Sequence, residues 1–286
     1  MKNSNSLADS LKSVFALVVI PVLFAISFVI YYFYLGDPAN FQGNDPANHP
    51  VEGNYLGIVY KGGVIVPILI GNLLIVITFA IERFITISIA KGKGSVKSFV
   101  NKIRTLVASN NITQAIAECD RQKGSVANVV KAGLSKYSEL AKDTSMDAEQ
   151  KVALIQKDIE ETTQLEMPML EKNLVILATI VSVATLLGLL GTVLGMIKAF
   201  AALATAGSPD SVGLANGISE ALINTALGIG TSALAIFSYN YFNSQIDGLV
   251  QFIDEIGFTV TQQITISHGK KNSNSVNHSY KKEVQL

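Results

Sequence analysis

The sequence is short of charge, of cysteine and of histidine, and each shortage excludes a class of protein. Only 15% of the 286 residues are charged and 49% are hydrophobic, whereas a soluble domain carries about 25% charged residues. A single cysteine, Cys119, excludes an intrachain disulfide framework and a thiolate metal cluster. The three histidines are scattered, and the 22 basic and 22 acidic residues cancel, so no overall field favours nucleic acid. This composition predicts a chain that lies partly in lipid.

Four long apolar runs are the segments that would lie in lipid. A helix needs about 20 mostly apolar residues to cross a bilayer, and the runs that meet this length are 14–35, 64–90, 173–203 and 214–242. The first run follows Lys2 and Lys12, as a cleaved signal peptide would. Its apolar stretch of about 22 residues and the lack of a small-x-small cleavage site favour a retained anchor.

The basic residues orient these spans. They crowd into the segment 91–172 and the C-terminal tail, whereas the loop 36–63 holds only Lys61 and the loop 204–213 holds none. Positive residues stay on the cytoplasmic side of a membrane. Both termini and the segment 91–172 are therefore predicted to be cytoplasmic, and the two short loops periplasmic.

The predicted fold class is an all-α, polytopic membrane protein with four transmembrane helices and long cytoplasmic helical extensions. In chain order, the predicted parts are a cytoplasmic N-terminus (1–13), helix 1 (14–35), a periplasmic loop (36–63), helix 2 (64–90), a cytoplasmic helical region (91–172), helix 3 (173–203), a short periplasmic loop (204–213), helix 4 (214–242), and a cytoplasmic helix end with a disordered tail (243–286). Within the cytoplasmic region, Asn110 or Asn111 is a candidate helix cap and Pro168 a candidate kink.

The third span carries a narrow face of small and hydroxyl-bearing residues. At about 100° per residue, this face falls within an arc of roughly 80°. It consists of Thr185, Gly188, Thr192, Met196 and Ala199. On a neighbouring arc, Gly191 and Gly195 form a GxxxG pattern, which permits a second helix to approach closely.

The fourth span contains one ionisable residue in its apolar run, Glu220. It lies about 9 Å along the helix from Leu214. Asn224, one turn further, is a candidate hydrogen-bond partner for it, and the polar stripe continues through Thr225, Gly228, Thr231 and Ser232. An intramembrane carboxylate faces a bundle interior, a partner or water. Two interpretations stay open: a structural glutamate held within the bundle, or part of an ion pathway.

The sequences GLLGTVLGM (188–196) and GISEALINTALGIG (217–230) together resemble the paired motifs of the MotA/TolQ/ExbB proton channel family, in its ExbB/TolQ branch. The resemblance covers 64–242, with AIERF (80–84) at the end of the second span. On the matching positions it implies that Thr192, Thr225 and Glu220 line a proton pathway. The supporting face would be Thr185, Gly188, Asn224, Gly228, Thr231 and Ser232.

The resemblance also implies partners and a place in the cell. The family's subunits form a pentamer in the bacterial inner membrane around two single-span helices of an ExbD- or TolR-type partner, which brings the proton-accepting aspartate. A TonB- or TolA-type protein then transmits the work. No cofactor, metal or nucleic acid is expected. Three features depart from the family pattern: the added N-terminal span, Leu234 in place of a common proline, and Asn224 in place of a small residue.

Several functions compete at this stage. An ExbB-like subunit that energises TonB-dependent uptake is favoured over a TolQ-like subunit for envelope integrity and division, and over a MotA-like stator, which usually has a larger cytoplasmic region. The spacing Ser88-x-x-Lys91 is typical of some serine enzymes, but no companion motif follows. A non-conducting scaffold is the remaining alternative.

Overall fold

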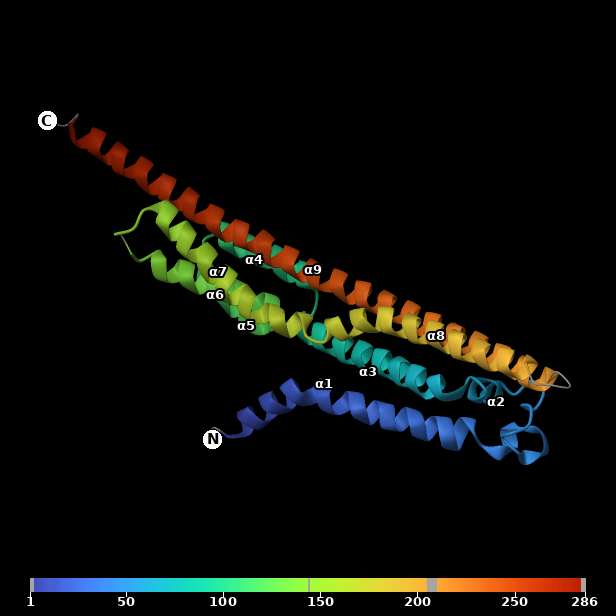
Figure 1. Cartoon of the computed structure of the whole chain (residues 1–286). Coiled ribbons are helices and arrows are strands. Elements are labelled where there is room, and N and C mark those ends of the chain that lie inside the picture. The colour runs from blue at the N-terminus through green and yellow to red at the C-terminus, as the bar shows by residue number, and fades with distance from the viewer. Residues whose placement is uncertain (1–2, 144, 205–209, 284–286) are drawn as a thin grey trace. The chain divides into compact units, whose positions relative to one another are not determined.

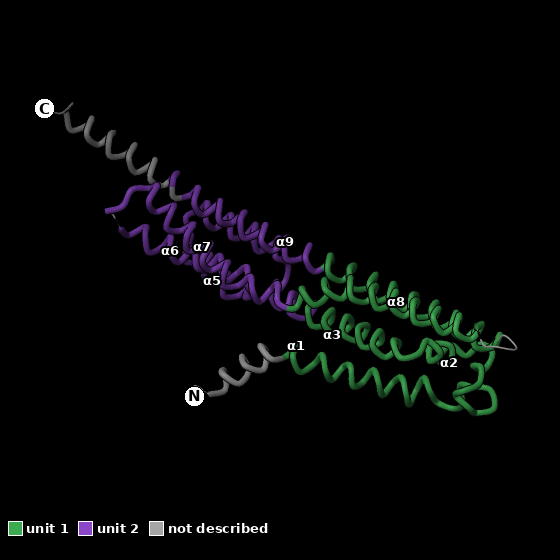
Figure 2. Tube along the Cα trace, viewed as in Figure 1, with its two compact units in different colours: residues 1–83, 173–241 green, residues 84–172, 242–286 purple. Residues whose placement is uncertain are grey.

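The structure is a computed structural model that describes residues 3–143, 145–204 and 210–283, with side chains described between residues 15 and 266 apart from 144, 205–209 and 264. The regular structure of the described residues is helical, and their single bridge pairs Phe41 with Pro50 outside any strand (Figure 1). The predicted all-α class is confirmed. Two compact units divide the chain: 1–83 with 173–241, and 84–172 with 242–286 (Figure 2).

Unit 1, residues 1–83 and 173–241, contains the apolar helices. Its elements are α1 (Asn3–Val29), η1 (Ile30–Leu35), η2 (Pro38–Asn40), η3 (Gln42–Asn44), α2 (Tyr55–Tyr60), η4 (Gly63–Ile65), most of α3 (Val66–Ala90), α8 (Leu174–Leu203) and the first part of α9 (Ser211–Glu283). Among the described residues, four helices are long and apolar enough to cross a membrane, at Phe15–Leu35, Gly63–Ala90, Leu174–Leu203 and within Ser211–Gln263. This confirms a polytopic all-α architecture.

The segment between the first two candidate spans is ordered by its own hydrogen bonds. The first span ends in a π-helix, η1, whose Tyr31 is buried and donates its hydroxyl to the Tyr60 carbonyl at 3.1 Å. Asn40 donates its amide to the carbonyl of Leu35 at 3.0 Å. The ammonium of Lys61 donates to the carbonyl of Pro46 at 2.9 Å. These bonds fold residues 36–62 back on the end of the first span.

Unit 2, residues 84–172 and 242–286, is a bundle of amphipathic helices. It contains α4 (Val96–Ala108), α5 (Ile112–Gln122), α6 (Ser125–Leu140), α7 (Ala148–Glu171) and the later part of α9. Side chains cap three of the four short helices. Ser95 caps α4, Asn111 caps α5, and Asp147 forms a capping box with Gln150 on α7. The predicted cap at Asn111 is therefore confirmed, whereas Asn110 instead hydrogen-bonds Tyr137.

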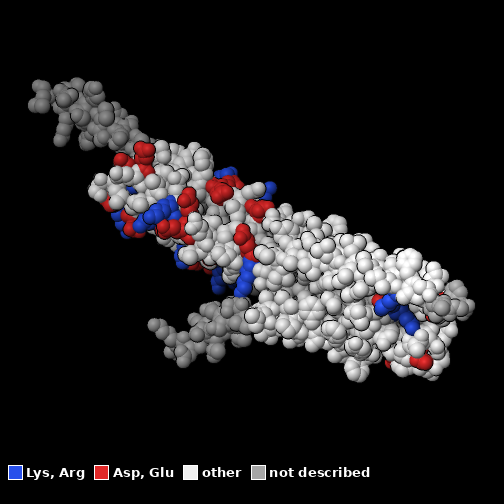
Figure 3. Space-filling model, viewed as in Figure 1, with Lys and Arg blue, Asp and Glu red and all other residues white. Residues whose placement is uncertain are grey.

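Apolar side chains of unit 2 point into one core. Ile103, Val107, Leu134 and Ile155 are each fully buried. Charged residues gather on the visible face of this unit, while the visible face of unit 1 is largely uncharged (Figure 3). Burial of the apolar face against neighbouring helices is the ordinary source of helical stability in water.

The junction between α7 and α8 is a break. Pro168 lies inside α7, which ends three residues later at Glu171, and Asn173 adopts a left-handed conformation with φ of 66° before α8 begins. Pro168 was predicted to kink the chain here, and the helix ends within one turn of it. At the other end, α9 extends to Glu283; its side chains from 267 onward, where a disordered tail is predicted, lie outside the described residues.

Candidate functional site

The predicted motif residues come together where α8 and the first part of α9 lie side by side in unit 1 (Figure 1). Glycine permits this contact. A Cβ built on Gly195 would lie 2.6 Å from the backbone nitrogen of Ala221, and one built on Gly188 would lie 3.1 Å from the Cα of Gly228. Neither neighbour is a flexible side-chain end that could move aside. The small face predicted on the third span is therefore a helix–helix contact surface.

Thr192 and Thr225 meet across this contact. Their hydroxyl oxygens lie within hydrogen-bonding distance of each other, and both side chains are half-buried. Each hydroxyl also lies 3.1 Å from a carbonyl of its own helix, Thr192 from Gly188 and Thr225 from Ala221. A hydroxyl carries one proton and accepts through two lone pairs. The two hydroxyl protons can therefore form only two of these three hydrogen bonds at one time. Rotation of the two hydroxyls can reverse which threonine donates to the other.

Glu220 forms an ion pair that the sequence analysis missed. Lys198 of α8 places its ammonium nitrogen 2.6 Å from one carboxylate oxygen of Glu220 and 2.8 Å from the other. The carboxylate side is buried, with the Glu220 side chain 9% exposed, while the Lys198 side chain is 55% exposed. The signal was present, because Lys198 is the one basic residue within the third apolar run.

Asn224 does not bind Glu220 as predicted. Its amide nitrogen donates instead to the carbonyl of Gly62, at 2.7 Å, and the side chain is fully buried. Its amide oxygen has no hydrogen-bond partner among the described residues. The turn at Gly62 and Gly63 lies against α9, and this contact brings the Gly62 carbonyl within hydrogen-bonding distance of the Asn224 amide.

The remaining predicted residues support the helix contact. Ser232 of α9 donates to the carbonyl of Val181 on α8 at 2.7 Å, which links the two helices directly. Thr185 donates to the same carbonyl within its own helix at 3.1 Å. Thr231 is buried, and Gly228 lies against Gly188. The structure thus brings Thr192, Thr225, Gly188, Gly228 and Ser232 to the contact between α8 and α9.

A second polar cluster lies at the other end of the α3–α8 pair. Glu82 accepts from the Nε of its neighbour Arg83 at 2.6 Å, and Asn173 donates to Glu82 at 3.4 Å. Arg83 is 1% exposed. These residues belong to the AIERF motif and the start of α8, so the motif connects two spans within unit 1.

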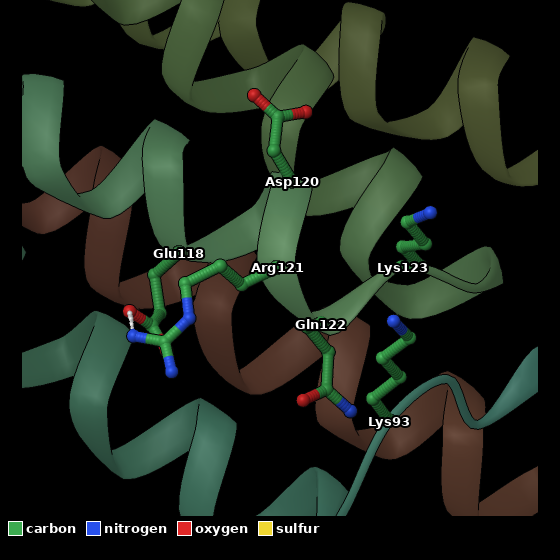
Figure 4. A pocket seen from close by; sticks show the side chains of 6 residues that line it. All are labelled: Lys93, Glu118, Asp120, Arg121, Gln122 and Lys123. Atoms are coloured by element: carbon green, nitrogen blue, oxygen red, sulfur yellow. Dashed lines mark hydrogen bonds and ion pairs between the residues drawn. The ribbon is translucent and has the colours of Figure 1, made fainter.

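Unit 2 has a charged hollow beside α5, lined by Lys93, Glu118, Asp120, Arg121, Gln122 and Lys123 (Figure 4). Its carboxylates already have cationic partners: Glu118 pairs with Lys102 at 2.8 Å, and Asp120 with Lys131 at 2.6 Å. The hydrogen bond from Lys102 lowers the pKa of Glu118. Among the described residues, no group of three or more His, Cys, Asp or Glu is placed to hold a metal ion.

The serine–lysine spacing gains no support from geometry. The ammonium of Lys91 donates to the side-chain oxygen of Gln245, 154 residues away in the chain. Ser88 is exposed on α3. Lys91 thus ties α3 to α9 within unit 2, as a structural lysine does.

Comparison with known proteins agrees with the motif. Residues 121–255, which include α8 and the contact with α9, match the model of the MotA/TolQ/ExbB proton channel family. Residues 121–255 are therefore similar to this family. It is 31% identical over 137 residues to the Tol-Pal system protein TolQ of Pseudomonas aeruginosa, which covers 48% of this chain and 59% of that protein.

Other relatives bear both names of the branch. A putative biopolymer transport protein, ExbB-like 3, of Synechocystis is 36% identical over 88 residues (30% of this chain, 42% of that protein). The biopolymer transport protein ExbB of Xanthomonas campestris is 29% identical over 100 residues (35% and 40%). The chain spans about half the length of these relatives. Together with the apolar helices, they support a multi-pass inner-membrane protein of the ExbB/TolQ branch.

Proposed function

We propose that the chain is an ExbB-like channel subunit that couples the proton gradient to TonB-dependent transport across the outer membrane. In this proposal both termini are cytoplasmic, a homopentamer surrounds an ExbD-type partner, and Thr192, Thr225 and Glu220 line the proton pathway. The observation that carries it is the hydroxyl pair between α8 and α9. A proton that rides on a partner's aspartate needs polar neighbours that do not titrate, and threonine supplies them.

The geometry favours the pair over scattered hydroxyls. Thr179 on α8 also bonds back to its own helix, at 2.7 Å to the carbonyl of Val175, but it is exposed. Threonine in an apolar helix commonly makes this local bond without any further role. A hydroxyl that also contacts a hydroxyl on the facing helix can form a hydrogen bond between the helices in which either group donates. Thr192 and Thr225 make this contact.

The test is to replace these hydroxyls by methyl groups of similar shape. Thr192→Val and Thr225→Val are each expected to lower proton flux, measured in vesicles that contain the partner, by about fivefold or more, since a hydrogen bond contributes about 1 kcal/mol. The matched control is Thr179→Val on the same helix, which should conduct as the wild type does. Oligomer size is measured beside flux, and it should stay unchanged.

The same experiment separates conduction from scaffolding. A non-conducting scaffold needs only to assemble. Energised transport at the wild-type rate in the Thr192→Val/Thr225→Val double variant would therefore reject the ion pathway. The TolQ-like alternative differs only in what is driven. Copurification with a TolA-type instead of a TonB-type protein would assign the chain to envelope integrity and division.

A further inference from the structure

The ion pair between Lys198 and Glu220 is unevenly buried, and this asymmetry points to its role. The ammonium contacts both carboxylate oxygens, at 2.6 and 2.8 Å. The glutamate side chain is 9% exposed, whereas the lysine side chain is 55% exposed. An unpaired Lys198 would keep water around its ammonium, because lysine extends its charged end toward solvent. An unpaired Glu220 would remain a buried charge.

Glu220 is also confined on the side away from Lys198. Gly63, with φ of +75°, lies so close that a Cβ built there would be 2.8 Å from the carboxyl carbon of Glu220. One helical turn further along α9, Asn224 holds the adjacent Gly62 carbonyl. The turn before η4 is thereby fixed against the carboxylate. Besides Lys198, the Tyr31 phenol of η1 lies within electrostatic range of Glu220.

We propose that Lys198 is a positioning residue that holds Glu220 fixed between α8 and the Gly62–Gly63 turn, so that Glu220 does not itself carry the transported proton. A proton carrier must exchange partners as it gains and loses its proton. Both carboxylate oxygens of Glu220 are instead held by one ammonium through charge-assisted hydrogen bonds. The inference rests on the proposed function only where it concerns the transported proton; the positioning of Glu220 is a property of the isolated chain.

The threonine pair lies at a different depth. Thr192 precedes Lys198 by six residues, which is about 9 Å along a helix. Glu220 precedes Thr225 by five residues on the facing helix. The ion pair therefore lies between the hydroxyl pair and the segment that joins α8 to α9.

A double-mutant cycle on the purified full chain in detergent tests the positioning. We expect Lys198→Met to lower the thermal midpoint more than Glu220→Gln does, because it leaves the buried partner unpaired. Combining the two should recover most of the loss, and Lys198→Arg should retain the wild-type midpoint. The control pair Lys61→Met with Glu220→Gln should be additive, since Lys61 bonds the carbonyls of Pro46 and Ala47 instead. Additivity in the Lys198 cycle, or the reverse order of the single variants, would overturn the inference.

Proton flux in vesicles with the partner then tests the carrier question. Lys198→Met is expected to lower flux about tenfold or more, because an unpaired buried carboxylate destabilises the conformation that contains it. Adding Glu220→Gln should restore flux toward the wild-type rate with the same pH midpoint, an outcome that a carrier role of the carboxylate does not share. Loss of flux in the double variant, or a displaced midpoint, would identify Glu220 as a carrier. A wild-type protein that conducts nothing would reject the proposed function, while the detergent cycle would still decide the positioning.

Discussion

The two units of this chain are both made of helices, but their surfaces and their helix contacts differ. In unit 2, helices bury large apolar side chains such as Ile103 and Ile155 and keep their charges outside, in exposed pairs such as Arg104 with Glu255. In unit 1, large apolar side chains such as Leu189 and Phe237 are exposed on the helix surface. The contact between α8 and α9 uses glycines and hydrogen bonds instead.

The difference follows from the solvent that each unit is expected to face. Water drives apolar side chains together, so unit 2 gains stability from buried area. Lipid offers no such drive between helices, so packing and polar contacts determine which helices associate. The candidate pathway belongs to the second regime, because its hydroxyls and its ion pair lie at the glycine contact between α8 and α9.

The largest expected effect tests the hydrophobic side of this comparison. Ile155 of α7 is fully buried in unit 2, and Ile155→Ala should lower the free energy of unfolding by about 2–5 kcal/mol. The readout is alkylation of Cys119, the single cysteine, which is buried in the same unit. Burial raises the pKa of its thiol to about 12, so the folded protein should be inert at pH 8.

The control for this substitution lies on the same helix. Leu165 is 80% exposed, and Leu165→Ala should leave alkylation of Cys119 at the wild-type rate. If both variants accelerated the alkylation of Cys119 equally, the stability of unit 2 would not depend on burial of apolar side chains in its core.

The next effect tests the glycine contact of unit 1. Gly195→Ala introduces a Cβ at 2.6 Å from the Ala221 nitrogen and should destabilise the protein by about 1–3 kcal/mol, as overpacking does. Gly230 of α9 has open space around its Cβ position, so Gly230→Ala should be stabilising by about 0.5–1 kcal/mol through helix propensity. Thermal midpoints by circular dichroism measure both, and shifts in the same direction would contradict the close packing of α8 and α9.

The smallest effect concerns how helices begin. Asp147 caps α7 in unit 2 through the backbone nitrogen of Gln150 at 2.7 Å, whereas Asn173 before α8 caps nothing with its side chain. Asp147→Ala should cost about 1 kcal/mol of stability, and Asp147→Asn much less, because asparagine also caps well. Alkylation of Cys119 measures the difference. Equal rates in the two variants would show that the cap is irrelevant to unit 2.

Much of the fold is visible in the sequence because local patterns produce it. The third predicted span, 173–203, differs by one residue from α8, and Asn111 caps α5 as its position predicts. Apolar runs and cap residues act through neighbours in the chain, so they need no knowledge of the rest of the molecule. The break at Asn173 was only partly visible, since Pro168 marks the region but the left-handed residue does not follow from it.

The candidate site likewise has features that follow from local sequence patterns and features that depend on distant segments. Helical periodicity places Thr192 and Thr225 on small polar faces, and the resemblance pairs them. Periodicity cannot say which residue of a distant segment meets a given side chain. It therefore assigned Asn224 to Glu220, one turn away, and left Lys198 without a partner.

The sequence by itself determined the helices, their small faces and the resemblance to a family, because each depends on residue type and spacing along one chain. Only the tertiary structure decided that Lys198 pairs with Glu220 and that Asn224 holds the carbonyl of Gly62, 162 residues away. A buried polar atom takes the partner that the packed backbone brings within about 3 Å. The partners of Glu220 and Asn224 therefore depend on how α8, α9 and the turn at Gly62 pack together, and none of these segments determines them alone.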